Sequence, residues 1–196
     1  MAKRITDHRK HIEETIKAFD EDRVLLVSCG KEGLPNAMAI GWGTTGIIWR
    51  RPIFAVLVRP SRYTYKLIEE TGEFVVNVPL QAINDQIDYC GYHSGSDVDK
   101  FKETGLTPKP ARRMKAPIID ECVAHMECKL RQVIEAGDKK LFVGEVVEAY
   151  ADKALENGKK TAKYAEGDFP AKVYSTRFGV QGPPLAEAAA KRLKDD

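Results

Sequence analysis

Residues 51–79 read RPIFAVLVRPSRYTYKLIEETGEFVVNVP. The continuous apolar run at 53–58 has the length of a strand, and it predicts a strand that is covered on both faces. A helix is predicted to follow Pro60 and to end at Gly72, because glycine commonly stands just past a helix C-terminus. Residues 74–78 predict a second strand. The stretch therefore predicts a strand, a polar turn, a helix and another strand.

The turn between the first strand and the helix is rich in polar groups. Ser61, Arg62, Tyr63 and Thr64 bring hydroxyls and a guanidinium to the start of the helix. Free backbone N–H groups at a helix N-terminus, together with a fork-shaped cation, are suited to binding a phosphate monoester. The alternative is an N-capped surface helix with an incidental arginine.

The rest of the chain predicts mostly strands joined by hairpin turns. These strands are expected at 24–29, 36–43, 122–135 and 141–150. Helices are expected at 7–19, 83–89 and 185–193, and a long polar loop at 90–113, with one helical turn, is expected to be functional. Few helices lie between the strands, which favours a mainly β, antiparallel barrel with flanking helices over a doubly wound sheet. We expect a single domain over residues 1–196.

Composition excludes several classes of function. Charged residues make up 31% of the 196 residues, yet the net charge is only +2 and no basic block is present, which argues against nucleic acid as the partner. The first residues lack the apolar run of a signal peptide, and no apolar segment is long enough to span a bilayer. We therefore expect a cytoplasmic protein with no membrane partner.

The four cysteines form no CxxC pair. Cys122 and Cys128 are an even number of residues apart on the strand expected at 122–135, so we expect them to share its apolar face as buried, reduced thiols. A metal or redox role is the alternative, which this spacing does not favour. His93 and His125 are expected in a loop and on the surface.

Several motifs together resemble a known family. They are NAMAIGWG at 36–43, RPSRYTYKLIEETGEFVVNVP at 59–79, DVDKFKETGLTP at 97–108 and APIIDECVAHMECKL at 116–130. In this order they resemble the flavin reductase-like, FMN-binding split-barrel proteins, and within that family the flavoredoxins, over residues 24–178. The resemblance implies a six-stranded antiparallel Greek-key barrel, a homodimer, and FMN bound at the subunit interface.

The resemblance also implies a set of cofactor-binding residues and no catalytic side chain or metal. Asn36 and Trp42 are expected beside the flavin ring and ribityl chain, and Lys100 at the phosphate or ribityl end. The full set is Asn36, Met38, Ala39, Ile40, Trp42, Ser61, Arg62, Tyr63, Thr64, Asn77, Lys100 and Phe178. Without the resemblance, Trp42 and Phe178 are also typical core aromatics, Asn36 a turn residue, Lys100 a solvated charge and Asn77 a strand residue.

One turn departs from the pattern of the family. Many members that use NAD(P)H carry Gly-Asp-His where this chain has Gly137-Asp138-Lys139-Lys140, which argues against direct use of NAD(P)H. We expect an oxidoreductase of the flavin or ferric reductase type that passes reducing equivalents through non-covalent FMN. The alternatives are a flavoredoxin-like electron-transfer protein with a redox protein as partner, and a flavin-binding sensor or storage protein. No GxGxxG fingerprint is present, so NAD(P)H, if used, would bind over the flavin.

Overall fold

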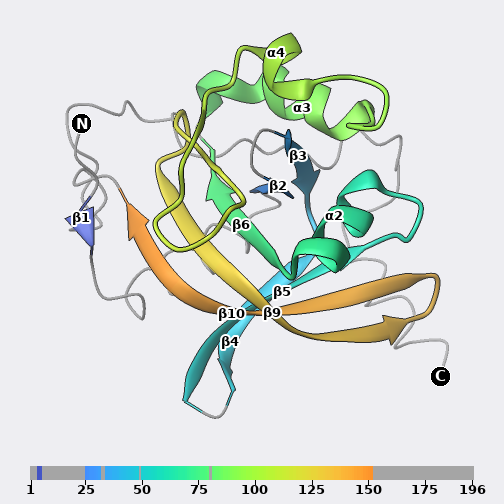
Figure 1. The fold of residues 1–196 in the computed structure, drawn as a ribbon, viewed down its shortest axis with the longest axis vertical. Coiled ribbons are helices and arrows are strands. Elements are labelled where there is room, and N and C mark those ends of the chain that lie inside the picture. Colours follow the sequence, from blue (N-terminus) through green and yellow to red (C-terminus); the bar gives the residue numbers. More distant parts are fainter. Residues whose placement is uncertain (1–3, 6–24, 32–33, 49, 80, 152–196) are drawn as a thin grey trace, which may run out of the picture.

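The computed structural model describes residues 4–5, 25–31, 34–48, 50–79 and 81–151 (Figure 1). The strands are β1 (Arg4–Ile5), β2 (Leu25–Lys31), β3 (Leu34–Ile40), β4 (Gly43–Ile48), β5 (Arg51–Val58), β6 (Glu73–Val78), β7 (Pro108–Lys109), β8 (Ile118–Ile119), β9 (Ala124–Ala136) and β10 (Lys139–Ala151). The helices are α2 (Tyr63–Thr71), α3 (Asn84–Tyr92) and α4 (Lys100–Thr104), with one 3-10 turn, η1 (Gln81–Ile83). The helix expected at 7–19 and the segments expected after residue 151 lie outside the described residues.

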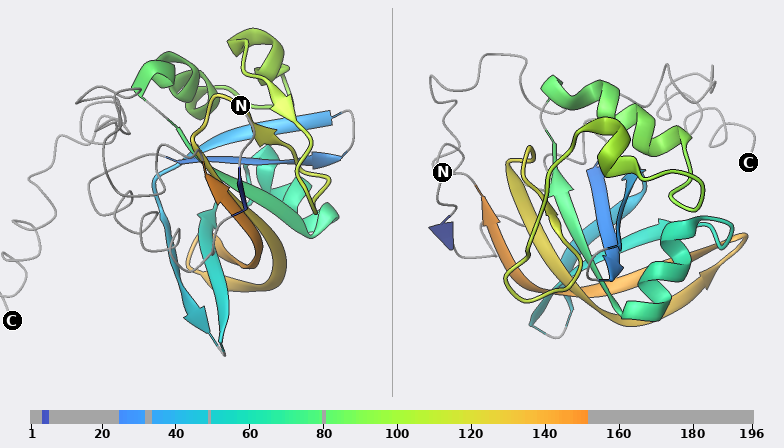
Figure 2. Two further views of the ribbon diagram at one scale, coloured as in Figure 1. Left: turned by 90° about the vertical axis from the view of Figure 1, so that its left-hand side faces the viewer. Right: turned by 45° about the horizontal axis from the view of Figure 1, so that its top comes forward.

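The main sheet is antiparallel and curls into a barrel. Its order is β3-β2-β6-β9-β10-β5-β4, and β1 pairs with β10. The edge strands β3 and β4 are joined by only Gly41 and Trp42, and Leu57 N donates to Trp42 O at 3.1 Å. The sheet must therefore bend until its two edges meet at this connection (Figures 1 and 2). The mainly β antiparallel barrel is confirmed, and its sheet contains β4 and the short β1 in addition to the six strands expected.

The barrel interior is filled by large apolar side chains. Phe54, Phe74 and Phe142 are fully buried, and burial of such a side chain contributes about 1.5–3 kcal/mol. From α2, Tyr65 packs its ring edge-on against Phe142, with centroids 5.2 Å apart. The helix ends as predicted at Gly72, whose φ of 70° is the left-handed conformation and whose N–H donates to Ile68 O at 2.8 Å.

A second apolar cluster lies between the barrel and the helices α3 and α4. Both helices pack against β3, across one end of the barrel (Figure 2). The cluster includes Ala37 from β3, Cys90 and Phe101 from the helices, and Cys122. Cys128 instead belongs to the barrel interior. The prediction that Cys122 and Cys128 share one strand face is therefore wrong, because β9 begins only at Ala124.

The first half of β9 is buried on both faces, whereas the sequence predicts one apolar face and a surface position for His125. His125 is 1% exposed and Glu127 is fully buried, because the chain between α4 and β9 covers this face. Glu127 accepts hydrogen bonds from Arg112 N at 2.8 Å, Arg113 N at 2.7 Å and Tyr150 Oη at 2.8 Å. The prediction of a surface position for His125 is wrong. His93 is exposed at the end of α3, as predicted.

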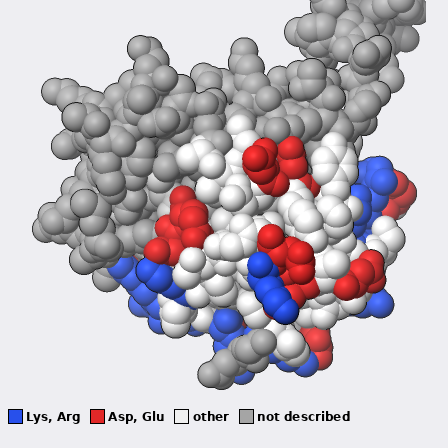
Figure 3. All heavy atoms as spheres, turned by 90° about the horizontal axis from the view of Figure 1, so that it is seen from above, with Lys and Arg blue, Asp and Glu red and all other residues white. Residues whose placement is uncertain are grey.

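The charged side chains form small groups of both signs on the face seen from above (Figure 3). Acidic groups lie across the middle of this face, one of them beside a basic group, and further basic groups lie along its lower and right-hand margins. None of the described residues in this view forms a basic stripe. No described helix is both long enough and apolar enough to cross a bilayer.

Candidate functional site

Two adjoining cavities lie beside β3, at the end of β5 and the start of α2. The larger cavity measures about 390 Å³ and is lined by Met38, Ala39, Ile40, Gly41, Trp42, Leu57, Val58, Arg59, Arg62 and Lys139. The smaller cavity measures about 190 Å³ and is lined by Met38, Ala39, Ser61, Arg62, Tyr63, Thr64, Cys90, Gly91, His93, Ser94, Gly95 and Lys100. Met38, Ala39 and Arg62 line both, so the two cavities form one continuous site.

The smaller cavity opens onto the N-terminus of α2. Arg62 is the N-cap residue, and no side chain caps the helix. Tyr65 N already donates to Arg62 O at 3.0 Å, so the N–H groups available to an anion are those of Tyr63 and Thr64. Thr64 is buried at 2% exposure, whereas Ser61 and Arg62 are exposed. The Arg62 guanidinium has no hydrogen-bond or ion-pair partner among the described residues. The arrangement that the sequence predicted at this turn is present.

Lys100 reaches the same cavity from α4 and is buried at 4% exposure. Its Nζ donates to Ala37 O and to Cys90 O, each at 2.8 Å. An ammonium group has three donor protons, so one remains for a ligand. Burial lowers the pKa of Lys100, and the nearby Arg62 guanidinium acts in the same direction. A bound anion would oppose both effects and stabilise the charged ammonium.

Asn36 stands behind the smaller cavity and does not line it. At 2% exposure, its Nδ2 donates to Thr64 Oγ1 at 2.9 Å. Because Thr64 Oγ1 accepts from Asn36, its own hydrogen is free to point into the cavity. Asn36 Oδ1 is buried without a hydrogen-bond partner among the described residues. It faces Gly95, where an added Cβ would lie 2.1 Å from it. Asn36 is thus a positioning residue.

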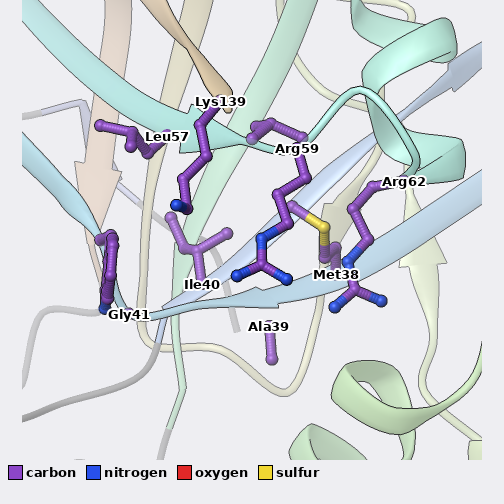
Figure 4. A pocket seen from close by; sticks show the side chains of 10 residues that line it. Met38, Ala39, Ile40, Gly41, Leu57, Arg59, Arg62 and Lys139 are labelled. Atoms are coloured by element: carbon purple, nitrogen blue, oxygen red, sulfur yellow. The ribbon is translucent and has the colours of Figure 1, made fainter. Parts of the chain in front are cut away.

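The larger cavity has apolar walls and a cationic margin. Met38, Ile40 and Leu57 supply apolar surface, and Figure 4 shows Arg59, Arg62 and Lys139 reaching toward the same space. These cations come from three separate places in the fold: the end of β5, the start of α2 and the first residue of β10. An apolar slot with a few convergent polar groups is typical of a site for a planar organic ligand.

Trp42 forms part of the rim of the larger cavity and is 52% exposed. Lys139 Nζ lies 5.4 Å from the centroid of its ring, a separation at which cation and ring attract each other. On the outer side of Lys139, Asp138 Oδ1 lies 2.6 Å from Lys139 Nζ, and Asp138 Oδ2 lies 4.0 Å from Arg59 Nε. Lys139, which stands where the family resemblance leads one to expect histidine, therefore faces the site.

The structure does not bring Asn77 to either cavity. Asn77 is fully buried on β6, where its Oδ1 accepts from Ile119 N at 3.1 Å and lies 2.8 Å from His125 Nδ1, while its Nδ2 donates to Ser28 Oγ at 2.9 Å. This network anchors the segment that covers β6 and β9. The prediction that Asn77 faces a cofactor is corrected accordingly: its side chain is used within the protein. Phe178 lies outside the described residues.

Sequence reasoning missed part of the lining. Arg59 is not among the site residues that the sequence predicts, and the segment 93–95 is predicted only as part of a long loop, although both line the site. One signal was available for the loop: glycine flanked by serines after a helix is typical of backbone that approaches closely to another group. No sequence pattern indicated that Arg59 and Lys139, eighty residues apart, lie side by side.

The cysteines contribute no reactive thiolate. Burial raises the pKa of Cys29 to about 12 and that of Cys90, which lines the smaller cavity, to about 11, so both thiols are protonated at neutral pH. The four cysteines are free, and no group of His, Cys, Asp and Glu among the described residues is arranged to hold a metal. The prediction of buried, reduced thiols is confirmed.

Comparisons with known proteins agree with this geometry. A flavoredoxin from Methanosarcina acetivorans has a similar structure, with a TM-score of 0.65, 33% identity, and coverage of 76% of this chain and 77% of that one. Flavoredoxin of Desulfovibrio vulgaris (Miyazaki F) gives a TM-score of 0.63 and 30% identity, with 76% of each chain covered. An FMN-binding protein from Thermus thermophilus, with bound p-hydroxybenzaldehyde, gives a TM-score of 0.63 and 27% identity over 69% of this chain and 74% of that one.

The sequence model of the flavin reductase-like domain matches residues 21–172. That span contains every segment that lines the two cavities. The antiparallel split barrel, the open helix terminus and the match in sequence lead to one assignment: the chain belongs to the flavin reductase-like domain family.

Proposed function

We propose that this protein binds FMN non-covalently and acts as an oxidoreductase that passes reducing equivalents through it. The observation that carries the proposal is the pairing of a small polar cavity with a larger apolar one, joined at Met38, Ala39 and Arg62. The smaller cavity suits a terminal phosphate and the larger one a flavin ring. The flavoredoxin structures and the Thermus FMN-binding protein support this cofactor.

The donor set fits a phosphate monoester. Arg62 and Lys100 supply charge, Ser61 and Thr64 supply hydroxyls, and the start of α2 supplies backbone N–H groups. When bound, FMN would supply the redox chemistry, since its ring accepts a hydride or single electrons. The residues of the chain hold the phosphate, orient the ring against β3 and shield it from water.

The backbone of β3 is also suited to the ring. β3 is an edge strand of the described sheet, so one side of its backbone lacks a strand partner. Residues 38–40 of this strand line the larger cavity. Alternate residues of an antiparallel strand turn their N–H and C=O groups away from the partner strand, and Ala37 is one of them, since its C=O accepts from Lys100 Nζ. The N–H and C=O groups of Ala39 are therefore available along a flavin edge, and Trp42 covers the rim.

The proposal is tested by titrating purified apoprotein with FMN, riboflavin and FAD and following flavin fluorescence. We expect one FMN bound per chain. Riboflavin should bind more weakly because it lacks the phosphate, and FAD should be hindered because its adenylate would extend from a cavity of about 190 Å³. Failure of FMN to bind, or equal binding of FMN and riboflavin, contradicts the proposal.

A second candidate function is electron transfer without turnover of NAD(P)H. The observation that favours it is Lys139 at the rim of the larger cavity, in place of the histidine of many family members that use NAD(P)H. The two functions differ in the steady-state oxidation of NADH or NADPH with free FMN or a ferric chelate as acceptor. Sustained oxidation supports the reductase, and its absence, with FMN bound, supports the carrier.

We also propose a homodimer with the cofactor near the subunit interface. The half-exposed Trp42 at the cavity rim supports this, because a second subunit would cover it.

A further inference from the structure

Cations line both cavities, and neither lining includes a carboxylate. The larger cavity has Arg59, Arg62 and Lys139, and the smaller one adds Lys100. The whole chain has a net charge of only +2, so this positive charge is concentrated locally. A phosphate monoester carries roughly −1.5 to −2 charges at neutral pH, which Arg62 and Lys100 can balance. Arg59 and Lys139 are then in excess at the other end of the site.

The nearest counter-charge to this pair is Asp138, which lies outside the cavity lining. Its carboxylate is 2.6 Å from Lys139 Nζ and 4.0 Å from Arg59 Nε. The Asp138 side chain is 69% exposed, whereas that of Lys139 is 19% exposed. Water therefore screens the carboxylate more than the ammonium, and the larger cavity keeps a positive potential.

We propose that Arg59 and Lys139 make the site bind reduced FMN more tightly than oxidised FMN, so that the cofactor stays on the protein through its redox cycle. This inference rests on the proposed function. Two electrons and one proton, taken from a donor and from water, convert oxidised FMN into an anion with one additional negative charge on the ring. The cations stabilise that charge whichever way the ring is turned, because Coulomb interactions act over several ångströms in a partly buried cavity.

This preference distinguishes the two candidate functions. A flavin reductase that supplies free reduced flavin must release it after each turnover, and tight binding of the reduced form would slow that release. A protein that retains reduced FMN can instead pass its electrons directly to an acceptor. The charge of the larger cavity therefore favours the carrier, in which FMN is a resident group and not a diffusing product.

The experiment measures the two-electron midpoint potential of bound and of free FMN at pH 7. An anaerobic titration with dithionite and a reference dye yields both values, and their difference is proportional to the logarithm of the ratio of the affinities for the two redox forms. We expect the potential of bound FMN in the wild type to lie above that of free FMN. Lys139→Gln and Arg59→Gln should each lower the preference for reduced FMN about tenfold, equivalent to ~30 mV.

Two further variants test whether the shift in midpoint potential has the direction that the charges predict. Asp138→Asn removes the nearby negative charge and should raise the potential, opposite to Lys139→Gln. Lys129→Gln, an exposed lysine on β9 that lines neither cavity, should leave the potential unchanged. The differences should shrink as salt is added, because exposed charges are screened.

The results that would overturn the preference for reduced FMN are the following. A bound potential below that of free FMN overturns the inference while the proposed function stands. Shifts of the same sign for Lys139→Gln and Asp138→Asn, or a Lys139→Gln shift no larger than that of Lys129→Gln, overturn it equally. If the apoprotein takes up neither form of FMN, the proposed function fails and the inference fails with it.

Discussion

Arg62 is the residue at which the two cavities meet, and its guanidinium is not engaged by any described side chain. Arg62 lies at the N-cap of α2, where its planar guanidinium can bind two phosphate oxygens at once. A lysine ammonium would bind the phosphate with less defined geometry. Lys100 lines the same smaller cavity from α4, and its ammonium is held by two carbonyl oxygens.

We predict that Arg62→Ala weakens FMN binding roughly tenfold to a hundredfold, because a charge-assisted hydrogen bond contributes about 1.5–3 kcal/mol. Riboflavin affinity should hardly change. Fluorescence titration of the variant with both flavins checks this, with Arg51→Ala, a surface arginine on β5, as the control. Equal losses for both flavins would mean that Arg62 supports the fold and not the phosphate.

At the scale of elements, the segment between α3 and α4 forms one wall of the smaller cavity by close backbone contact. Gly95 approaches Asn36 and Tyr63 so closely that a Cβ would lie 2.1 Å from Asn36 Oδ1 and 3.1 Å from Tyr63 Cδ1. The absence of a side chain at this position lets α3 and α4 close over β3. It also leaves the amide of Asn36 directed at Thr64.

We predict that Gly95→Ala displaces Asn36 or the loop, lowers the free energy of unfolding by about 1–3 kcal/mol as overpacking does, and weakens FMN binding. Gly46→Ala is the matched control, since nothing lies within 4 Å of a Cβ there, and it should change stability by about 0.5 kcal/mol or less. Urea unfolding and FMN titration measure both effects. If the Gly95→Ala protein is as stable as the Gly46→Ala protein and binds FMN normally, the segment between α3 and α4 accommodates the added methyl group without loss of stability.

At the scale of the whole molecule, the described surface leaves several large apolar side chains in water beside the larger cavity and along β4. Trp42 is 52%, Ile47 60% and Ile48 51% exposed. Ile47 and Ile48 are adjacent, so they project from opposite faces of an edge strand. Exposed apolar residues gathered on an edge strand are typical of surfaces that are covered by another chain.

We predict that the FMN-loaded protein sediments at about twice the 21.9 kDa chain mass, and that bound FMN stabilises the dimer by mass action. Ile47→Asp should weaken the dimer, whereas Leu34→Asp, at a residue that is 68% exposed in the β2–β3 hairpin, should not. A holoprotein that stays monomeric at micromolar concentration contradicts a site completed at the interface.

The fold was largely predictable because its signals are local. Three predictions rest on patterns only a few residues long, and each is confirmed: the strand at 53–58, the end of the helix at Gly72 and the turn at Gly137. The polar end of the site was predictable for the same reason, since Ser61, Arg62 and Thr64 are neighbours in sequence.

What could not be predicted depends on covering segments. Apolar and polar residues alternate along β9, which indicates one solvent-exposed face. The chain from 105 to 123 lies over that face and buries His125 and Glu127. Asn77 was assigned to the cofactor by resemblance, whereas its side chain serves that covering segment. Periodicity reports which side chains tolerate burial, and it does not report which distant segment buries them.

The order of strands in the sheet has a consequence for the moment at which the protein acquires its cofactor during biosynthesis. β3 and β5, which carry opposite walls of the larger cavity, are joined through β2, β6, β9 and β10. The strand ladder that links β5 to β6 runs through β10, which ends at Ala151 and leaves the ribosome last among the described strands. The phosphate-sized pocket needs nothing beyond Lys100, whereas the ring-sized one needs Lys139. Flavin uptake should therefore be a late event, and the colour of a newly made chain should report that its last described strand is in place.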